Sequence, residues 1–465
     1  MKPFAFDIKT DPEEAFSALQ TQPYSLWLDS ADTDHPQGRF SYIVSHPVET
    51  IEAKDGRVTV TNAGQQTVLR CDPFDMLNER LAAWNSNAEK IEDLPPFQGG
   101  LAGFFGYDLA RGLEKLPSST RLNPHMPDMA FGVYDRVIAF DHDRNKAWLI
   151  IHAEDKKEAE RKRTVLLHIL KNRKTEPKEN PLLRWSPAEL AESYKAKIKR
   201  VIEYINAGDI FQANLSQRFE AVLPPSFDRF SHYLSMRKVN PAPFAAYMNL
   251  GGIVISSASP ENFLSVQDKK VVTRPIKGTR PRGRDKKEDE QNRDELARSI
   301  KDRAENIMIV DLLRSDLSKV CEPRSVELTD LCKVETFAGV HHLVSTIEGK
   351  LEGSPVDLVR ACFPGGSITG APKIRSMEII EELETARRGP YCGAMAWMGF
   401  DGAMDSSILI RTLVYQNNKV TLQTGGGITA GSDADAEYAE TLAKAEKIFR
   451  SFDATHAQVK KNLTA

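Results

Sequence analysis

Lys277 is the first residue of this sequence whose surroundings suggest chemistry. It stands in "VVTRPIKGT", between a β-branched run and Gly278. A lysine held in a desolvated pocket has a lowered pKa, so its neutral amine can act as a nucleophile. A basic run follows from Arg280 to Lys287, and a solvated surface loop is therefore the competing interpretation. This segment alone leaves both open.

Carboxylates fall at helical spacing in two separate segments. In "KDRAENIMIVDLLRSDL", Asp302 and Glu305 lie one turn apart. In "DAEYAETLAKAEKIF", Glu437 and Glu440 have the same spacing. Such pairs on two helices could hold a hard divalent cation such as Mg2+, partly through water and an anionic substrate. Solvated helix faces, and an ordinary ion pair between Glu440 and Lys444, are the alternative.

Two glycine-rich segments could bind an anion. "FPGGSITGAPKIRSMEII" lacks the spacing of a P-loop, but Pro372 at the start of a helix would leave the free N–H groups of the first turn facing the loop. In "QTGGGITAGS", the glycines at 425–427 would let a ligand approach the backbone closely. Plain turns are the alternative in both cases.

Three further segments contain isolated polar residues. Arg411 in "SSILIRTLV" is flanked by Ile and Leu, so we expect it to be buried and paired with a substrate carboxylate or an internal acid. Glu261 in "SASPENFL" lies at a strand end, where it could act as a general acid or base. His341 and His342 would face opposite sides of a strand, so at most one of them serves a site.

The bulk composition excludes several classes of function. The 465 residues include 62 Lys and Arg against 65 Asp and Glu, and a net charge of −3 gives no general attraction to nucleic acid or to a membrane surface. The five cysteines form no CxxC pair, and the N-terminus lacks the apolar core of a signal peptide. We therefore expect a cytoplasmic protein. Neither GxSxG nor GxCxG occurs, so we do not expect amide hydrolysis.

These residues must be positioned by helices and strands, and the order in which the sequence predicts them indicates an α+β fold with large mixed or antiparallel sheets flanked by helices. Helices are predicted at 73–83, 156–171, from Ser186-Pro187 to Gly208, at 288–320, 372–383 and 434–452. Strands are predicted in the second half at 212–222, 244–248, 252–257, 263–266, 270–273, 393–400, 407–415 and 419–424. "KNRKTEPKENPLLRWS" has the composition of a linker, which suggests two regions, 1–170 and 186–455.

Several motifs together resemble the chorismate-utilising enzymes, which include anthranilate synthase component I, aminodeoxychorismate synthase component I, isochorismate synthase and salicylate synthase. The matching segments are "DRAENIMIVDLLRSDL", "FPGGSITGAPKIRSMEII", "MDSSILIRTL" and "GGGI" followed by "AEYAET". "LPPFQGGLAGFFGYDLAR" and "PIKGT" look most like the aminodeoxychorismate synthase branch, because anthranilate synthases have alanine in place of Lys277. The resemblance implies an anthranilate synthase component I-like fold.

The resemblance also implies catalytic roles. Lys277 would attack the ring of chorismate as the C4 hydroxyl leaves, and Glu261 would be the general acid that protonates this hydroxyl. His342 would lie beside the ring. Ammonia would then displace the lysine and give 4-amino-4-deoxychorismate, on the route to 4-aminobenzoate and folate. A separate glutamine amidotransferase subunit would supply the ammonia, and a separate pyridoxal phosphate lyase would complete 4-aminobenzoate.

Binding roles follow from the same resemblance. Glu305 and Glu440 would bind Mg2+ directly, with Asp302 and Glu437 near the cation or its waters. The residues expected to hold the substrate are Ser367, Gly370, Ala371, Tyr391, Arg411, Gly425, Gly426, Gly427 and Lys444.

A second pocket, for tryptophan, is implied for the N-terminal region. It would be formed from "LWLDS", in which Asp29 stands where relatives have glutamate, from the segment after it, and from "NPAPFAAYM". Its residues would be Ser30, Gln37, Gly38, Arg39, Phe40, Pro243, Phe244 and Ala245. The alternatives for the whole chain are anthranilate synthase component I, with the same fold and substrate, and a non-catalytic tryptophan-sensing protein.

Overall fold

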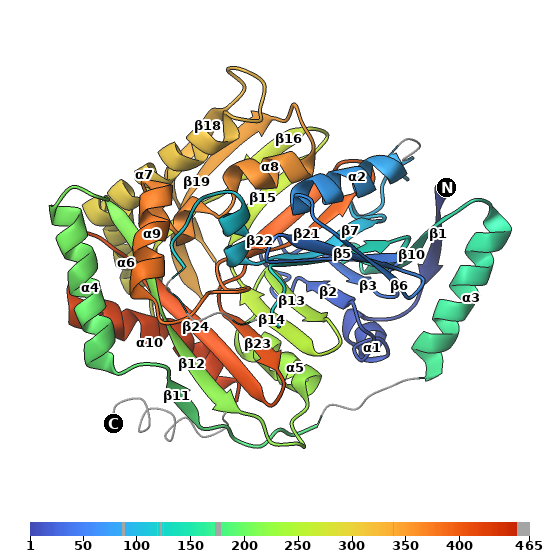
Figure 1. The fold of residues 1–465 in the computed structure, drawn as a ribbon, viewed down its shortest axis with the longest axis horizontal. Helices are drawn as coiled ribbons and strands as arrows, with labels where there is room; N and C mark the ends of the chain where they lie inside the picture. The colour runs from blue at the N-terminus through green and yellow to red at the C-terminus, as the bar shows by residue number, and fades with distance from the viewer. Residues whose placement is uncertain are drawn as a thin grey trace.

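Two sheets of twelve strands each form the centre of the protein in the computed structural model (Figure 1). The structure describes residues 1–85, 89–118, 120, 123, 125–172, 178–337 and 339–452, so part of the predicted linker and the C-terminal end lie outside the described residues. Every pairing between the described strands is antiparallel. The predicted α+β class is confirmed.

The first sheet runs, in spatial order, through β1 (Lys2–Ile8), β10 (Lys146–Ala153), β9 (Arg136–Asp141), β3 (Phe40–Val44), β2 (Ser25–Asp29), β13 (Phe244–Asn249), β14 (Ile253–Ser259), β23 (Thr412–Gln416), β24 (Lys419–Ile428), β12 (Gln212–Val222) and β11 (Trp185–Pro187), with β20 (Gly370–Ala371) also on β12. The second runs through β17 (Ile276–Pro281), β19 (Val340–Lys350), β16 (Lys270–Thr273), β15 (Asn262–Gln267), β22 (Met404–Ile408), β21 (Ala394–Gly399), β7 (Gly100–Phe105), β8 (Met129–Tyr134), β4 (Glu49–Lys54), β5 (Arg57–Asn62) and β6 (Gln65–Leu69), with β18 (Glu327–Thr336) on β19.

The helices lie mostly around the periphery of these sheets (Figure 1). They are α1 (Pro12–Ser17), α2 (Pro73–Asn85), α3 (Lys156–Asn172), α4 (Ala191–Asn206), α5 (Arg229–Val239), α6 (Lys286–Arg298), α7 (Ile300–Leu317), α8 (Pro355–Cys362), α9 (Lys373–Leu383) and α10 (Ala434–Arg450), with short 3-10 turns η1 (Tyr107–Gly112) and η2 (Gly366–Ile368). None of the helices in the described residues is long and apolar enough to cross a membrane.

The core lies in three layers that follow from this arrangement. Side chains such as Leu26 and Ile255 of the first sheet pack against Phe104 and Trp397 of the second in one buried cluster between the sheets. The outer face of each sheet is covered by helices, in clusters that include α2, α7 and α8 on one side and α1, α5 and α10 on the other. Since both faces are covered, strands such as β7 are buried at every position and show no polar alternation.

The regions 1–170 and 186–455 are not separate layers of this fold. Each sheet takes strands from both regions: β13 pairs with β2 in the first sheet, and β21 pairs with β7 in the second. The division is therefore one along the sequence, whereas hydrogen bonding joins the two regions across the middle of both sheets.

Most predicted elements in the second half appear with nearly the predicted bounds, but three differ. Ser186 and Pro187 do not start a helix; they form β11, and α4 starts later with Leu190 as its N-cap. The single helix predicted at 288–320 is two helices, because Ser299 ends α6 and caps α7 by accepting from the Asp302 N–H. The strand predicted at 407–415 is also two, β22 and β23, which lie in different sheets.

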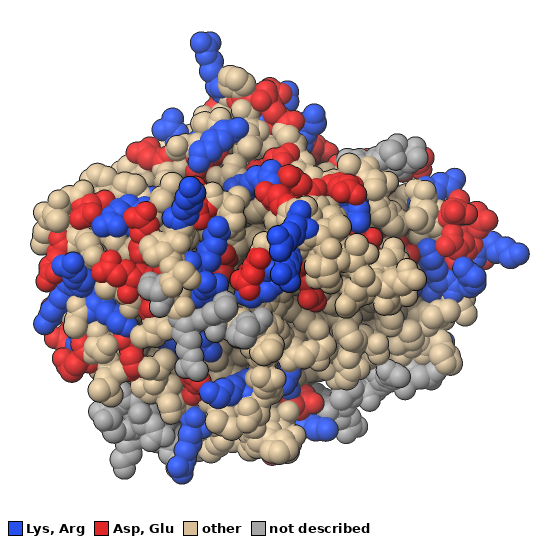
Figure 2. All heavy atoms as spheres, in the orientation of Figure 1, with Lys and Arg blue, Asp and Glu red and all other residues tan. Residues whose placement is uncertain are grey.

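The charged residues of the surface are mixed in sign. Lys and Arg side chains are interspersed with Asp and Glu in Figure 2, mostly over the upper and left parts of the face shown. The basic run after Gly278 is an example, since Arg280 pairs with Glu295 and Arg282 with Asp289 of the following helix. We expected a solvated loop over the whole run, but Arg280 lies in β17, Arg282 and Arg284 lie in the connection after it, and Lys286 and Lys287 start α6.

Candidate active site

One cavity of about 620 Å³ collects most of the predicted site residues. It lies where the chain crosses between the two sheets, at the β14–β15 and β22–β23 connections, and it is bounded by α7, α10, β17, β19 and β24. The predicted residues that line it are Glu261, Lys277, Asp302, Glu305, His342, Ser367, Tyr391, Arg411, Gly425, Gly427, Glu437, Glu440 and Lys444.

A register shift directs Lys277 into this cavity. Strand β17 pairs with β19 at Ile276 and again at Thr279, and the pairing slips between them. Such irregularities bend a strand and re-aim a side chain. Gly278 has φ +83°, and a Cβ there would lie 2.9 Å from the Cβ of Asp302, so only glycine fits beside the helix.

Ser367 joins Lys277 to Glu261. The Lys277 Nζ donates to the Ser367 carbonyl at 3.1 Å, and the Ser367 hydroxyl donates to the Glu261 carboxylate at 2.7 Å. Glu261 sits on the connection from β14 to β15, and its side chain is almost fully buried. Three segments far apart in the sequence thus bring an amine and a carboxyl to one serine.

Burial shifts the pKa values of these two groups in opposite directions. Loss of hydration raises the pKa of Glu261, an effect that Ser367 and Lys277 oppose. Loss of hydration lowers the pKa of Lys277, an effect that Glu305 and Glu261 oppose. Both shifts favour the neutral forms, an amine that can attack and a carboxyl that can give up a proton.

The carboxylates of α7 and α10 form one acidic wall of the cavity. Burial raises the pKa of Glu305, and Asp302 and Glu437 raise it further, against Lys277 and Lys301. No hydrogen bond from the described residues reaches the Glu305 carboxylate. Burial alone would raise the pKa of Glu440, but its ion pair with Lys444 at 2.7 Å lowers it.

The acidic wall could bind a cation, although the described side chains alone do not form a complete set of metal ligands. In the part of the chain described, no three Asp, Glu, His or Cys side chains are grouped as ready-made ligands. Repulsion between Glu305, Asp302 and Glu437 would nevertheless be relieved by a divalent ion. A cation bound through few carboxylates, with water and an anionic substrate completing its shell, fits this donor set.

Arg411 faces the cavity, and none of the described residues forms a hydrogen bond or an ion pair with its guanidinium. It lies in the bend between β22 and β23 with φ 52°, not within a strand as predicted. Burial lowers the pKa of its guanidinium, and the negative charge of Glu261 opposes this shift. A buried guanidinium needs an anion, so a substrate carboxylate remains the better of the two predicted partners.

The structure distinguishes the two histidines and places Tyr391. His342 lines the cavity, contacts the Thr279 hydroxyl at 2.9 Å, and has its pKa lowered to about 4 by burial and by Arg411. His341 faces the other way and contacts Asp289 at 3.0 Å. Tyr391 is buried in the loop before β21, at the cavity wall.

Some predicted substrate residues lie away from the cavity. Gly370 and Ala371 form β20, which pairs with β12. Lys373 at the start of α9 forms an ion pair with Asp316 at 2.6 Å, so its charge does not face the cavity. Residues 425–427 lie in β24 and not in a loop. Gly426, by contrast, faces the acidic wall of the cavity, since a Cβ there would lie 3.2 Å from the Glu437 carboxylate and 3.8 Å from the Glu440 carboxylate.

Sequence reasoning missed Asn214 and Lys301 at this cavity. Asn214 comes from β12, where it donates to the Ile368 carbonyl at 3.1 Å beside Ser367. Lys301 lies in the first turn of α7, 3.9 Å from Glu437. The strand pattern around Asn214 gives no sign of a site, since its neighbours are ordinary core residues.

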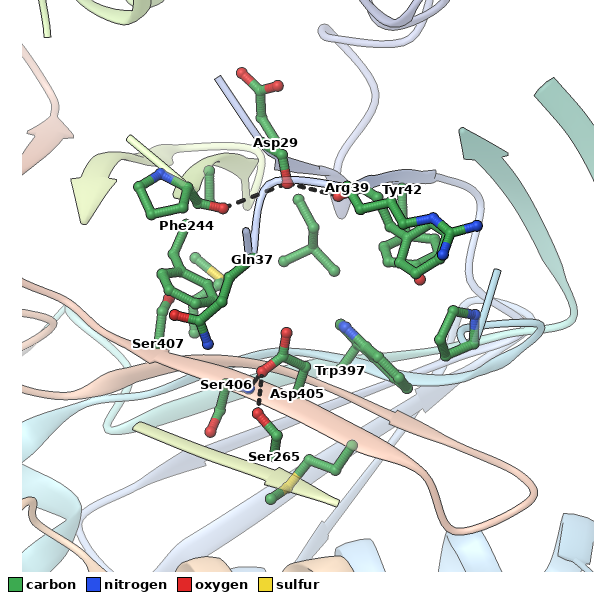
Figure 3. Close-up of a pocket in the computed structure, with 18 of the residues that line it drawn as sticks. Asp29, Gln37, Arg39, Tyr42, Phe244, Ser265, Trp397, Asp405, Ser406 and Ser407 are labelled. Carbon is green, nitrogen blue, oxygen red and sulfur yellow. Dashed lines mark hydrogen bonds between the residues drawn. The ribbon is translucent and has the colours of Figure 1, made fainter. Parts of the chain in front are cut away.

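A second cavity collects the residues predicted for tryptophan (Figure 3). The predicted residues that line it are Ser30, Gln37, Arg39, Phe40, Pro243, Phe244 and Ala245, whereas Gly38 does not. The Ser30 hydroxyl connects the two segments that form this cavity, because it can donate to the carbonyls of Phe40 and Pro243. The Asp29 carboxylate points away, toward Tyr233 and Arg237.

The opposite wall of this second cavity was not predicted. Trp397, Asp405 and Ser265 project from β21, β22 and β15 toward Phe244 and Gln37 (Figure 3). Burial raises the pKa of Asp405 to about 6, although the Ser265 hydroxyl donates to it at 2.8 Å. "MDSS" was recognised only as part of a family motif, which gave no indication that its aspartate faces a cavity.

Comparison with known proteins agrees with this geometry. Residues 24–450 match the chorismate binding enzyme family. The chain is 41% identical to aminodeoxychorismate synthase component 1 of Escherichia coli, over 94% of this chain and 95% of that protein. It is 38% identical to anthranilate synthase component 1 of Thermus thermophilus, over 98% of each.

A solved structure supports the same relationship. The crystal structure of anthranilate synthase component I from Streptococcus pneumoniae superposes with a TM-score of 0.80 at 33% identity, covering 89% of this chain and 92% of that one. The predicted anthranilate synthase component I-like fold is thereby confirmed. A match over nearly the whole length, in sequence and in fold, leads to one conclusion: this chain belongs to the chorismate binding enzyme family.

Proposed function

We propose that this enzyme converts chorismate and ammonia to 4-amino-4-deoxychorismate, as the first component of an aminodeoxychorismate synthase. The observation that carries the proposal is the Lys277–Ser367–Glu261 arrangement, with an amine and a carboxyl whose pKa values shift toward the neutral forms. Overall identity does not decide between the two activities, since 41% and 38% are nearly equal. Lys277 favours the aminodeoxychorismate activity, because the alanine expected at this position in anthranilate synthases could not attack a ring.

In the first step, the neutral Lys277 amine attacks the chorismate ring. A C–N bond forms and the C4–O bond breaks, and Glu261 gives its proton to the departing oxygen so that water leaves. Hydroxide is a poor leaving group without such a donor. Ser367 holds both groups, and Arg411 and Tyr391 would bind the enolpyruvyl carboxylate of the substrate.

In the second step, ammonia forms a bond at C4 while the bond to Lys277 breaks. The electron pair returns to the lysine, which leaves as a neutral amine, and the proton that the new ammonium group gives up restores the acid form of Glu261. The net reaction is chorismate plus ammonia to aminodeoxychorismate plus water. A glutamine amidotransferase subunit would supply the ammonia, as the words "component 1" in the names of the relatives suggest.

Mg2+ would be held by Glu305 and Glu440, with Asp302 and Glu437 nearby. When bound, it would neutralise the ring carboxylate of chorismate. Lys444, which contacts both Glu440 and the Gly425 carbonyl, lies where it could contact the same carboxylate.

The product formed from chorismate tests this proposal. The purified protein, incubated with chorismate, Mg2+ and an ammonium salt, should form no fluorescent anthranilate, and it should give 4-aminobenzoate once aminodeoxychorismate lyase is added. The Lys277→Ala variant should give neither. Formation of anthranilate by the wild-type protein would assign the other activity of the family.

A tryptophan site in the second cavity is a further part of the proposal. It is favoured by the convergence of Ser30, Phe40 and Phe244 on a cavity that also contains the aromatic ring of Trp397. Calorimetry with L-tryptophan should detect binding that Phe244→Ala weakens. Absence of binding to the wild-type protein would reject the site, whereas binding without any chorismate turnover would favour the sensor hypothesis.

A further inference from the structure

A fully buried ion pair lies directly behind the cavity. The side chains of Arg388 and Glu384 are 1% and 4% exposed. Arg388 donates to both carboxylate oxygens, with Nε at 3.0 Å and Nη2 at 2.8 Å. Burying two charges costs several kcal/mol per ion before their attraction is counted, so an apolar pair of equal volume would often be as stable. Stability alone therefore does not explain the pair.

Arg388 connects this pair to the loop of Ser367. Its Nη1 donates to the Ile368 carbonyl at 3.0 Å, and its Nη2 donates to the Asn214 carbonyl. Asn214 in turn donates to the Ile368 carbonyl through its side chain and to the Thr369 carbonyl through its backbone. The carbonyl of Ile368, which is the residue next to Ser367, thus accepts two hydrogen bonds.

Glu384 and two tyrosines fix the guanidinium itself. The Glu384 carboxylate accepts from the backbone N–H and the hydroxyl of Ser216, at 2.9 and 2.7 Å. The guanidinium carbon lies 4.6 Å from the ring centre of Tyr107 and 5.6 Å from that of Tyr391. Tyr391 also lines the cavity, so the same cation contacts a second residue of the proposed substrate site.

We propose that the Arg388–Glu384 pair positions the Ser367 loop and Tyr391 for the reaction. The route runs from Arg388 to the Ile368 carbonyl, from Ile368 to Ser367, and from Ser367 to the Lys277 amine and the Glu261 carboxyl. Neither member of the pair lines the cavity, so both are positioning residues. This inference rests on the proposed function for the roles of Lys277 and Glu261.

Lysine cannot replace Arg388 in this role. A guanidinium presents five donors in one plane, which lets it engage a carboxylate with two donors and reach two carbonyls with the others. An ammonium keeps the charge but not this geometry. In Arg388→Lys we expect kcat for chorismate consumption to fall at least about tenfold, with KM changing less than about threefold, because small misplacements of reacting groups cost rate before they cost binding.

A double-mutant cycle with Ser367→Ala tests the route. If Arg388 acts through Ser367, removing the hydroxyl should cost at least about threefold less in the Arg388→Lys background than in the wild type. Lys162→Met is the matched control, because it removes a partner of buried Asp135 far from the cavity; its effect should simply multiply with that of Ser367→Ala.

Multiplicative effects in the Arg388→Lys cycle, or a lower melting temperature with unchanged kcat, would overturn the inference. If Arg388→Lys does not fold, Glu384→Gln provides the same cycle with nearly unchanged shape. Chorismate consumption is followed whatever the product, so a wrong product assignment would show in the product assay and not here.

Discussion

Lys277 and Glu261 show how burial alone can prepare two residues for reaction. On a surface, a lysine and a glutamate are both charged. In this cavity loss of hydration dominates over their mutual attraction, so that the pKa of Lys277 falls and that of Glu261 rises. The neutral pair contains the same number of protons as the charged pair, but only the neutral pair has a nucleophile and an acid.

Glu261→Gln tests the acid role. Glutamine keeps the shape of the side chain and can still accept a hydrogen bond from the Ser367 hydroxyl, but it cannot act as a general acid. We expect turnover of chorismate to fall by about 10²–10⁴-fold, with the Kd for chorismate little changed. In the wild type, kcat should decline as the pH rises through the pKa of Glu261, which burial raises above the usual value of a glutamate, and this decline should be absent from the residual activity of the variant. Near-normal turnover by Glu261→Gln would exclude the acid role.

The facing helices α7 and α10 carry the electrostatics of the site. Each contributes two carboxylates to one cavity wall, and the pKa of Glu305 rises in response to burial and to its acidic neighbours. Such a wall is unfavourable while no cation or positively charged group balances it. Lys444 on α10 balances part of this charge through Glu440.

Removal of single carboxylates should therefore weaken Mg2+ binding. In the presence of chorismate, Glu305→Gln and Glu440→Gln should each raise the Mg2+ concentration that half-saturates binding by about tenfold or more, measured by calorimetry. Asp435→Asn is the matched control on α10, because its exposed carboxylate pairs with Lys195 outside the cavity. If all three variants bound Mg2+ as tightly as the wild type, the cation would not bind to the carboxylates of α7 and α10.

At the scale of the whole molecule, the cavity depends on both halves of the sequence. The proposed catalytic residues come from the second region, yet β13 and β21 pair with β2 and β7 of the first. Without these partners, strands from the middle of both sheets would have open edges and uncovered faces.

Residues 186–465 expressed alone should consequently not fold as an independent domain. We expect no cooperative thermal transition by circular dichroism, whereas the full chain should unfold cooperatively. A sharp transition of the fragment, together with chorismate binding, would establish the second region as a domain in its own right.

The sequence predicted individual elements better than their three-dimensional relations. Strand β16 has the predicted bounds because an apolar run between turn signals defines it locally. The break at Arg411 and the slip at Lys277 depend on pairing with strands far away, so no local pattern indicates them. Asp405 was missed for the same reason, since its cavity forms only when the two sheets face each other.

Mass spectrometry of the protein mixed with chorismate and Mg2+, without ammonia, tests the central claim most directly. The account predicts a covalent adduct of chorismate less water on the peptide that contains Lys277, its absence in Lys277→Ala, and its discharge when ammonia is added. An adduct that persists in Lys277→Ala, or aminodeoxychorismate formation at the wild-type rate by that variant, would contradict it.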